Sequence, residues 1–113
     1  MHALIARLLP ICRSITGDGV RETLRVLCET LPLIVHEVPS GTPVLDWTVP
    51  KEWNARDAWV ANAAGERVID FRENNLHLMG YSIPVRARLS LAELRARVAT
   101  LPDRPDWIPY RTS

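Results

Sequence analysis

The spacing of apolar residues changes near residue 40, and this change constrains the fold of the 113-residue chain more than any other feature. Up to Leu31 the apolar residues recur every three or four positions, as in amphipathic helices. After Pro43 they form short runs that alternate with polar residues, as in half-buried strands. We therefore predict an α+β chain with an N-terminal helical pair and a β-rich remainder containing one helix.

The helical pair is predicted from two stripes of apolar residues. The first covers residues 3–12 and is interrupted by Pro10, which lacks a backbone donor. The second follows the Gly-rich turn 16–19, takes Asp18 as its N-cap and ends before Pro32. Its stripe comprises Val20, Leu24, Leu27, Cys28 and Leu31. The β-branched run 33–38, bounded by prolines, predicts a strand.

Short strands and one helix are predicted for the remainder. Gly65 suits the turn of a hairpin, and Ser90 with Glu93 has the spacing of a capping box that opens a helix through about residue 99. The tail 103–113, with two prolines, is predicted to be extended. The predicted strands are 44–49, 57–62, 66–71 and 76–81.

Composition excludes several classes of partner. The net charge of +1 gives no electrostatic basis for binding nucleic acid or an anionic membrane. No apolar run reaches the ~18–20 residues that cross a bilayer, and the first ten residues do not resemble a signal peptide. Cys12 and Cys28 lie among apolar residues and form no CxxC motif, so we expect buried free thiols in a reducing cytoplasm.

The sequence contains no recognisable catalytic or cofactor motif. There is no GxGxxG, P-loop or GxSxG string. The possible metal ligands lack the tight spacing of a zinc site such as HExxH. We therefore predict no catalytic, cofactor-binding or metal-binding residue within this chain. The ligands considered are His36, Glu37, Asp46, Asp70, Glu73 and His77.

The aromatic residues all follow residue 46 and comprise four Trp, two Tyr and one Phe. We interpret most of them as the core of a small β domain. An alternative is a platform for peptide or glycan, because exposed Trp and Tyr rings present a flat apolar face with a polar edge. The residues expected to contact such a ligand are Trp53, Trp107 and Tyr110, and we expect Trp53 and Trp107 to be exposed.

Several unusual strings, spread over nearly the whole chain, resemble a bacterial aminopeptidase-like family whose members occur among polysaccharide-biosynthesis genes. The resemblance implies zinc-dependent peptidases of the metallopeptidase family twenty-eight type, with a β-rich domain inserted early in an α/β core. The strings are LPICRSITGDGVRETL (9–24), HEVPSGT (36–42), DWTVPKEWN (46–54), NNLH (74–77), GYS (80–82), LP (101–102) and IPY (108–110).

The resemblance places residues 1–40 as the first helices and strand of the peptidase core, and residues 44–110 as the inserted domain. The family's zinc ligands include a His in a Cys-His-Pro context, and His2, His36 and His77 do not match it. The resemblance thus implies an N-terminal part, not catalytic by itself, of a zinc hydrolase. Its partner would be the absent core, or another copy through the N-terminal helices. The alternative is a stand-alone binding or oligomerisation module.

Overall fold

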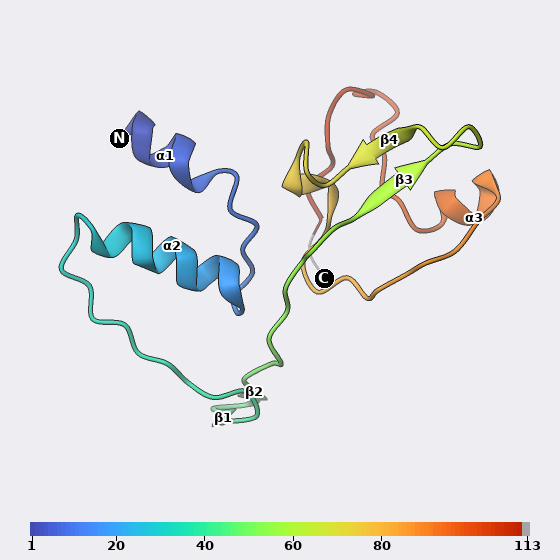
Figure 1. Cartoon of the computed structure of the whole chain (residues 1–113). Coiled ribbons are helices and arrows are strands. Elements are labelled where there is room, and N and C mark those ends of the chain that lie inside the picture. The colour runs from blue at the N-terminus through green and yellow to red at the C-terminus, as the bar shows by residue number, and fades with distance from the viewer. Residues whose placement is uncertain (112–113) are drawn as a thin grey trace. The chain divides into compact units, whose positions relative to one another are not determined.

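The computed structural model describes residues 1–111 and contains two compact units, Met1–Ala58 and the part that begins at Trp59 (Figure 1). Each unit combines helix with a small antiparallel sheet, which confirms the predicted α+β class. The first unit contains α1 (His2–Leu8), α2 (Asp18–Cys28), β1 (Pro43–Val44) and β2 (Trp47–Thr48). The second contains β3 (Trp59–Ala61), β4 (Arg67–Asp70), the 3₁₀ turn η1 (Asn75–His77) and α3 (Leu91–Arg95).

The predicted helical pair is present. α1 ends at Leu8, two residues before Pro10, and α2 ends at Cys28, four residues before Pro32. The guanidinium of Arg7 in α1 donates two hydrogen bonds to the carboxylate of Glu29, which directly follows α2; the Nη2–Oε1 distance is 2.7 Å. This bidentate pair joins the two helices on their exposed side.

The prediction of a strand at 33–38 is wrong for the described chain. Residues 32–39 form no helix, strand, turn or bend, although their composition favours a strand. A strand is defined by its hydrogen bonds to a neighbouring strand, and residues 1–111 supply no neighbour for this segment.

The single strand predicted at 44–49 is also wrong, because these residues fold back on themselves. β1 and β2 form a two-residue ladder in which Val44 pairs with Trp47. Leu45 has a φ of 52°, outside the range of a strand, and provides the turn. The pairing continues beyond the ladder, since the Val49 N–H donates to the Thr42 carbonyl at 2.9 Å.

The hairpin predicted around Gly65 is confirmed. β3 pairs antiparallel with β4, with Val60 opposite Ile69, and Gly65 has a φ of 86° in the loop. The side-chain oxygen of Asn62 accepts the backbone N–H groups of Ala64 and Glu66, both at 3.0 Å, and so fixes the loop from inside.

The strand predicted at 76–81 is replaced by η1. The side-chain oxygen of Asn74 accepts the Leu76 N–H at 3.0 Å, which starts a 3₁₀ turn in place of an extended segment. The helix at Ser90 is confirmed with both bonds of its capping box, but it ends at Arg95 and not near residue 99.

The tail forms two successive turns over residues 101–107, where we predicted an extended segment. The Arg104 N–H donates to the Leu101 carbonyl, and the Trp107 N–H donates to the Arg104 carbonyl, both at 3.0 Å. Each turn has Pro at its second position, where the fixed φ of proline favours turns. Positions 112 and 113 of the predicted tail lie outside the described residues.

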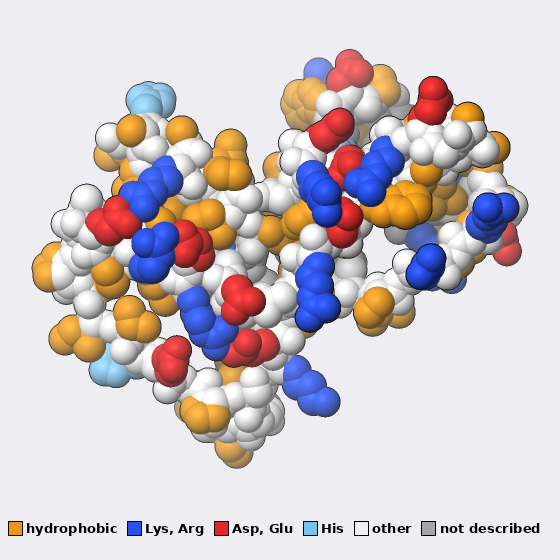
Figure 2. Space-filling model, viewed as in Figure 1, with side chains coloured by type: hydrophobic (Ala, Val, Ile, Leu, Met, Phe, Trp, Pro, Cys, Tyr) orange, Lys and Arg blue, Asp and Glu red, His pale blue; other side chains and the backbone are white. Residues whose placement is uncertain are grey.

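The described residues bury very little apolar surface. Within residues 1–111, Val26 is the one buried hydrophobic side chain, at 2% exposure, and apolar side chains are spread over the surface (Figure 2). The chain exposes 9896 Å². Two separate domains of half its 12.8 kDa mass each would expose ~7,600 Å² in total. The predicted aromatic core is therefore wrong, because Trp47, Trp59, Trp107 and Tyr110 are all exposed.

Candidate functional site

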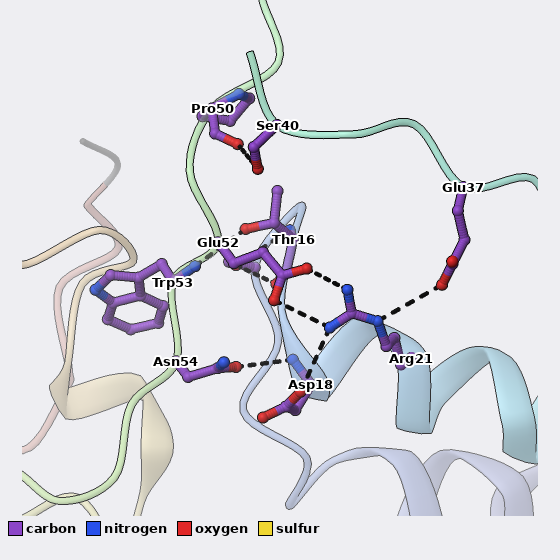
Figure 3. Close-up of polar contacts among 10 residues, drawn as sticks. Thr16, Asp18, Arg21, Glu37, Ser40, Pro50, Glu52, Trp53 and Asn54 are labelled. Atoms are coloured by element: carbon purple, nitrogen blue, oxygen red, sulfur yellow. Dashed lines mark hydrogen bonds and ion pairs between the residues drawn. The ribbon is translucent and has the colours of Figure 1, made fainter. Parts of the chain in front are cut away.

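The start of α2 is completed by residues that follow β2 in the chain (Figure 3). The N-cap of α2 is Gly17, not the predicted Asp18, and glycine has no side chain with which to accept a helix N–H. Instead, Asn54 Oδ1 accepts the Asp18 N–H at 2.7 Å. The Trp53 N–H donates to Thr16 Oγ1 at 3.2 Å. We call residues 16–21 together with 52–54 the α2 cradle.

Glycine at position 17 is required by this close approach. Gly17 is buried and has a φ of 87°, a region that favours glycine. A Cβ atom at this position would overlap the carbonyl oxygen of Trp53 and lie 2.5 Å from Asn54 Oδ1. The turn predicted at 16–19 is instead a bend over residues 15–17, because Asp18 and Gly19 already belong to α2. Gly17 in this bend lets two distant segments touch.

Arg21 connects three acidic side chains of the α2 cradle and its surroundings (Figure 3). Its guanidinium forms a bidentate pair with Glu52, with Nη1 3.1 Å from Oε2, and Nη1 lies 3.4 Å from Asp18 Oδ1. Its Nε lies 3.7 Å from Glu37 Oε1. The hydrogen bond from Arg21 holds the pKa of Glu52 below its ordinary value, and the same bond raises the pKa of Arg21.

The chemistry of the α2 cradle is structural. The carboxylates of Asp18, Glu37 and Glu52 all pair with the Arg21 guanidinium. The hydroxyls of Thr16 and Ser40 are hydrogen-bonded to backbone groups, and no imidazole is among the residues labelled in Figure 3. Within residues 1–111, no three His, Cys, Asp or Glu side chains are grouped so that they could hold a metal ion. The described residues therefore do not fit the zinc that the family resemblance implies.

The three predicted ligand-contact residues are divided between the two units. Trp53 is half-buried, against our expectation of exposure, because its backbone takes part in the α2 cradle. Trp107 is 62% exposed and Tyr110 is 87% exposed, as a ligand platform requires. The Arg104 guanidinium lies 5.0 Å from the centre of the Trp107 ring, a cation–π distance.

The two cysteines are free, as predicted, but they are not both buried. Cys12 is half-buried, and partial burial raises the pKa of its thiol. Cys28 is exposed at the end of α2, on the side of the helix away from Val26. Among the helices within residues 1–111, none has the length and apolar character needed to cross a bilayer.

Comparison with known families identifies the class. The family described as Domain of unknown function (DUF2172) matches residues 52–113, more than half of the chain. The chain therefore belongs to the DUF2172 family.

Two relatives from Clostridium acetobutylicum extend the comparison over the whole chain. One is named, provisionally, as a polysaccharide biosynthesis protein with an aminopeptidase-like domain, and it is 57% identical over all 113 residues. A crystal structure of a protein from that organism, titled provisionally as a peptidase, is also 57% identical and superposes with a TM-score of 0.94 over 99% of this chain.

The chain matches the N-terminal part of that solved structure. It spans 26% of the length of each relative. The part of each relative that the chain does not cover is therefore about three times as long as this chain.

Sequence reasoning missed the role of Arg21, Glu52 and Asn54. No local pattern links residues 16–21 to residues 52–54, because helix and turn signals extend over only a few positions. Both segments nevertheless belong to the strings that carry the family resemblance. The presence of both segments in those strings was the one sequence feature that pointed to a contact between residues 16–21 and 52–54.

Proposed function

We propose that this chain is the N-terminal, non-catalytic part of a zinc-dependent aminopeptidase-like hydrolase of the metallopeptidase family twenty-eight type. One observation carries the proposal: the chain is 57% identical, end to end, to a quarter of a protein named for an aminopeptidase-like domain. The same relative's name supports a place in polysaccharide biosynthesis. We further propose that the protein acts in the cytoplasm.

The residues that carry out hydrolysis would lie in the part of the relatives that this chain does not cover. In such enzymes zinc activates a water molecule for attack on the peptide bond. Among the described residues, no three His, Cys, Asp or Glu side chains are grouped as ligands for that ion. The carboxylates of Glu37 and Glu52 are instead ion-paired with Arg21. Residues 1–40 would belong to the peptidase core, and residues 44–110 would form an inserted β-rich domain that shapes access of the substrate.

An experiment that separates binding from catalysis tests this proposal. The 113-residue chain is loaded with zinc, dialysed and analysed for bound metal, and its turnover of aminoacyl p-nitroanilides is measured. We expect no stoichiometric zinc and no turnover for this chain, and both for the C. acetobutylicum relative. Tight zinc at one ion per chain, with turnover, would overturn the assignment. Absence of turnover in the full-length relative would overturn the peptidase activity itself.

A second candidate function is a non-catalytic module that binds peptide or glycan, or that forms oligomers. The high exposure of Trp107 and Tyr110 favours it. Titration with oligosaccharides and short peptides, followed by Trp fluorescence, tests ligand binding, with Trp107→Ala as the matched variant. Light scattering tests self-association. A monomer with unchanged fluorescence contradicts the module.

A further inference from the structure

Two arginines of the second unit lie over tryptophan rings, and they differ in one respect. Arg67 Cζ lies 5.1 Å from the centre of the Trp59 ring, and Arg67 Nη1 lies 2.7 Å from Asp70 Oδ2. Arg104 Cζ lies 5.0 Å from the centre of the Trp107 ring. Within the described part of the chain, Arg104 has no carboxylate partner. The first pair therefore has its anion, whereas the second presents an aromatic ring and a cation without one.

The acidic residues nearest to Arg104 in the sequence do not supply that anion. Asp103 precedes Arg104 and Asp106 follows it by two positions, and all three are exposed. These two acids balance the charges of Arg104 and Arg111, so residues 101–111 carry no excess of positive charge. An anion would consequently be held by direct contact with the Arg104 guanidinium and not by a field that acts over a longer range.

The segment that carries this cation also presents two exposed rings. Trp107 is 62% exposed and Tyr110 is 87% exposed, whereas Ile108 and Pro109 between them are half-buried. The two backbone turns over residues 101–107 fix the chain in front of the rings. Rings that are already exposed on a held backbone lose little conformational freedom when a ligand binds.

We propose that Arg104, Trp107 and Tyr110 form a binding site for an acidic glycan, one whose sugar units carry a carboxylate. The inference deepens the second candidate function and rests on it, in that it takes the exposed rings to bind a ligand. A guanidinium binds a carboxylate through parallel hydrogen bonds, and the apolar face of a sugar packs on an exposed aromatic ring. The ligand's carboxylate would stand to Arg104 as Asp70 stands to Arg67.

A glycan is favoured over an acidic peptide because the segment offers few backbone partners. An extended peptide is commonly held by hydrogen bonds to backbone groups. Pro102, Pro105 and Pro109 have no N–H, and the N–H groups of Arg104 and Trp107 already donate within the turns. Side chains and ring faces are what remain for recognition, and they suit a sugar. The place in polysaccharide biosynthesis proposed above agrees with this choice.

Titration of the 113-residue chain with oligogalacturonate, in which every sugar unit carries a carboxylate, tests the proposal at neutral pH. The fully methyl-esterified oligomer of the same length is the matched ligand, because it keeps the sugar faces and lacks the charge. A short glutamate oligomer represents an acidic peptide. The indole N–H signals in ¹H–¹⁵N spectra give the affinity and the place of binding. The Trp107 signal is identified by its absence from Trp107→Ala, and Trp59 serves as the reference.

Three variants separate the charge of Arg104 from its shape. Arg104→Gln removes the cation, and Arg104→Lys keeps the charge but lacks the planar fork that pairs with a carboxylate. Arg67→Gln is the matched control, because Arg67 also lies over a tryptophan ring but already has Asp70 as its partner. Thermal unfolding of each variant checks that the fold is kept.

We expect oligogalacturonate to shift the Trp107 signal and to bind at least tenfold more tightly than its methyl ester. Arg104→Gln should bind the acid at least tenfold more weakly and lose the preference over the ester, with Arg104→Lys between it and the parent. Arg67→Gln should bind within twofold of the parent. Equal affinity for acid and ester would overturn the proposal, as would equal affinity of the two Gln variants or no binding at all.

The remaining outcomes identify a different ligand. Tighter binding of the glutamate oligomer than of oligogalacturonate would assign the site to an acidic peptide and overturn the proposal. A shift of the Trp107 signal by the ester as large as by the acid would overturn the acidic class while the binding module is retained. None of these readouts depends on zinc or turnover, so the aminopeptidase-like assignment is judged separately.

Discussion

Asn54 closes the first turn of α2 from 36 residues further along the chain: its Oδ1 accepts the Asp18 N–H at 2.7 Å. The first four N–H groups of a helix have no partner within the helix, so a capping acceptor stabilises it. Here that acceptor comes from the segment after β2, because the N-cap residue is Gly17. Folding of α2 is thereby coupled to the position of residues 52–54.

The contribution of this contact is measurable by substitution. Asn54→Ala removes the acceptor, and we expect a loss of ~1 kcal/mol in the free energy of unfolding, the usual cost of deleting a cap. Asn54→Asp retains an oxygen acceptor, adds negative charge near the helix N-terminus, and should unfold like the parent. Urea unfolding followed by circular dichroism at 222 nm measures both. Equal loss in the two variants would contradict a capping role.

Gly17 and Gly41 provide a matched test of close approach. Both have a φ of 87°, but a Cβ at Gly41 would have no atom within 4 Å. Gly41→Ala should cost ~1–2 kcal/mol from the backbone conformation alone. Gly17→Ala adds overlap with Trp53, so we expect a clearly larger loss of unfolding free energy. Thermal unfolding measures the stability of both variants. An equal loss of stability in Gly17→Ala and Gly41→Ala would show that residues 52–54 shift without cost, and would contradict the prediction.

The Arg21–Glu52 pair predicts a pH dependence with a defined sign. The pKa of Glu52 is lower in the folded chain, so the stabilisation is present above the ordinary Glu pKa of ~4.3 and is lost as pH falls through the folded value. Arg21→Gln should return the pKa of Glu52 to its ordinary range, as read from its carboxyl ¹³C shift. Arg25→Gln, which removes the partner of Glu22, is the control and should leave Glu52 unchanged.

The two thiols should differ in reactivity. Cys28 is exposed, whereas Cys12 is half-buried with a raised pKa, so less of it is thiolate at neutral pH. We expect iodoacetamide at pH 7.5 to label Cys28 several times faster than Cys12. Peptide mass spectrometry measures the two rates, and labelling in 8 M urea should remove the difference. Faster labelling of Cys12 in the folded chain would contradict the described burial.

Several signals that act within a few residues were read correctly from the sequence, although the 3₁₀ turn started by Asn74 and the proline turns of the tail were missed. The capping box at Ser90, the turn at Gly65 and the helix over 18–28 each depend on side chains and backbone atoms close together in the chain. The ends of these elements were less accurate, as at Arg95. Local chemistry is sufficient for such elements because their partners lie within one or two turns.

Predictions that needed a distant partner failed or were missed. The run 33–38 has strand composition, but a strand forms only beside another strand, and none pairs with it within residues 1–111. At 44–49 the alternation was real, yet Leu45 turns the chain so that the two halves pair with each other. The contacts of Arg21 with Glu52 and of Asn54 with Asp18 had no local sign, because each joins residues more than 30 positions apart in the chain.

The β1–β2 turn has a practical consequence. Leu45 is almost fully exposed at the tip, and the segment it interrupts is tied at both ends to the start of α2. Cleavage at this tip places Asp18 and Asn54 on separate polypeptides. Reassembly of the two pieces after such a split then depends on the α2 cradle and on the β1–β2 pairing, which makes this position a natural site for complementation assays.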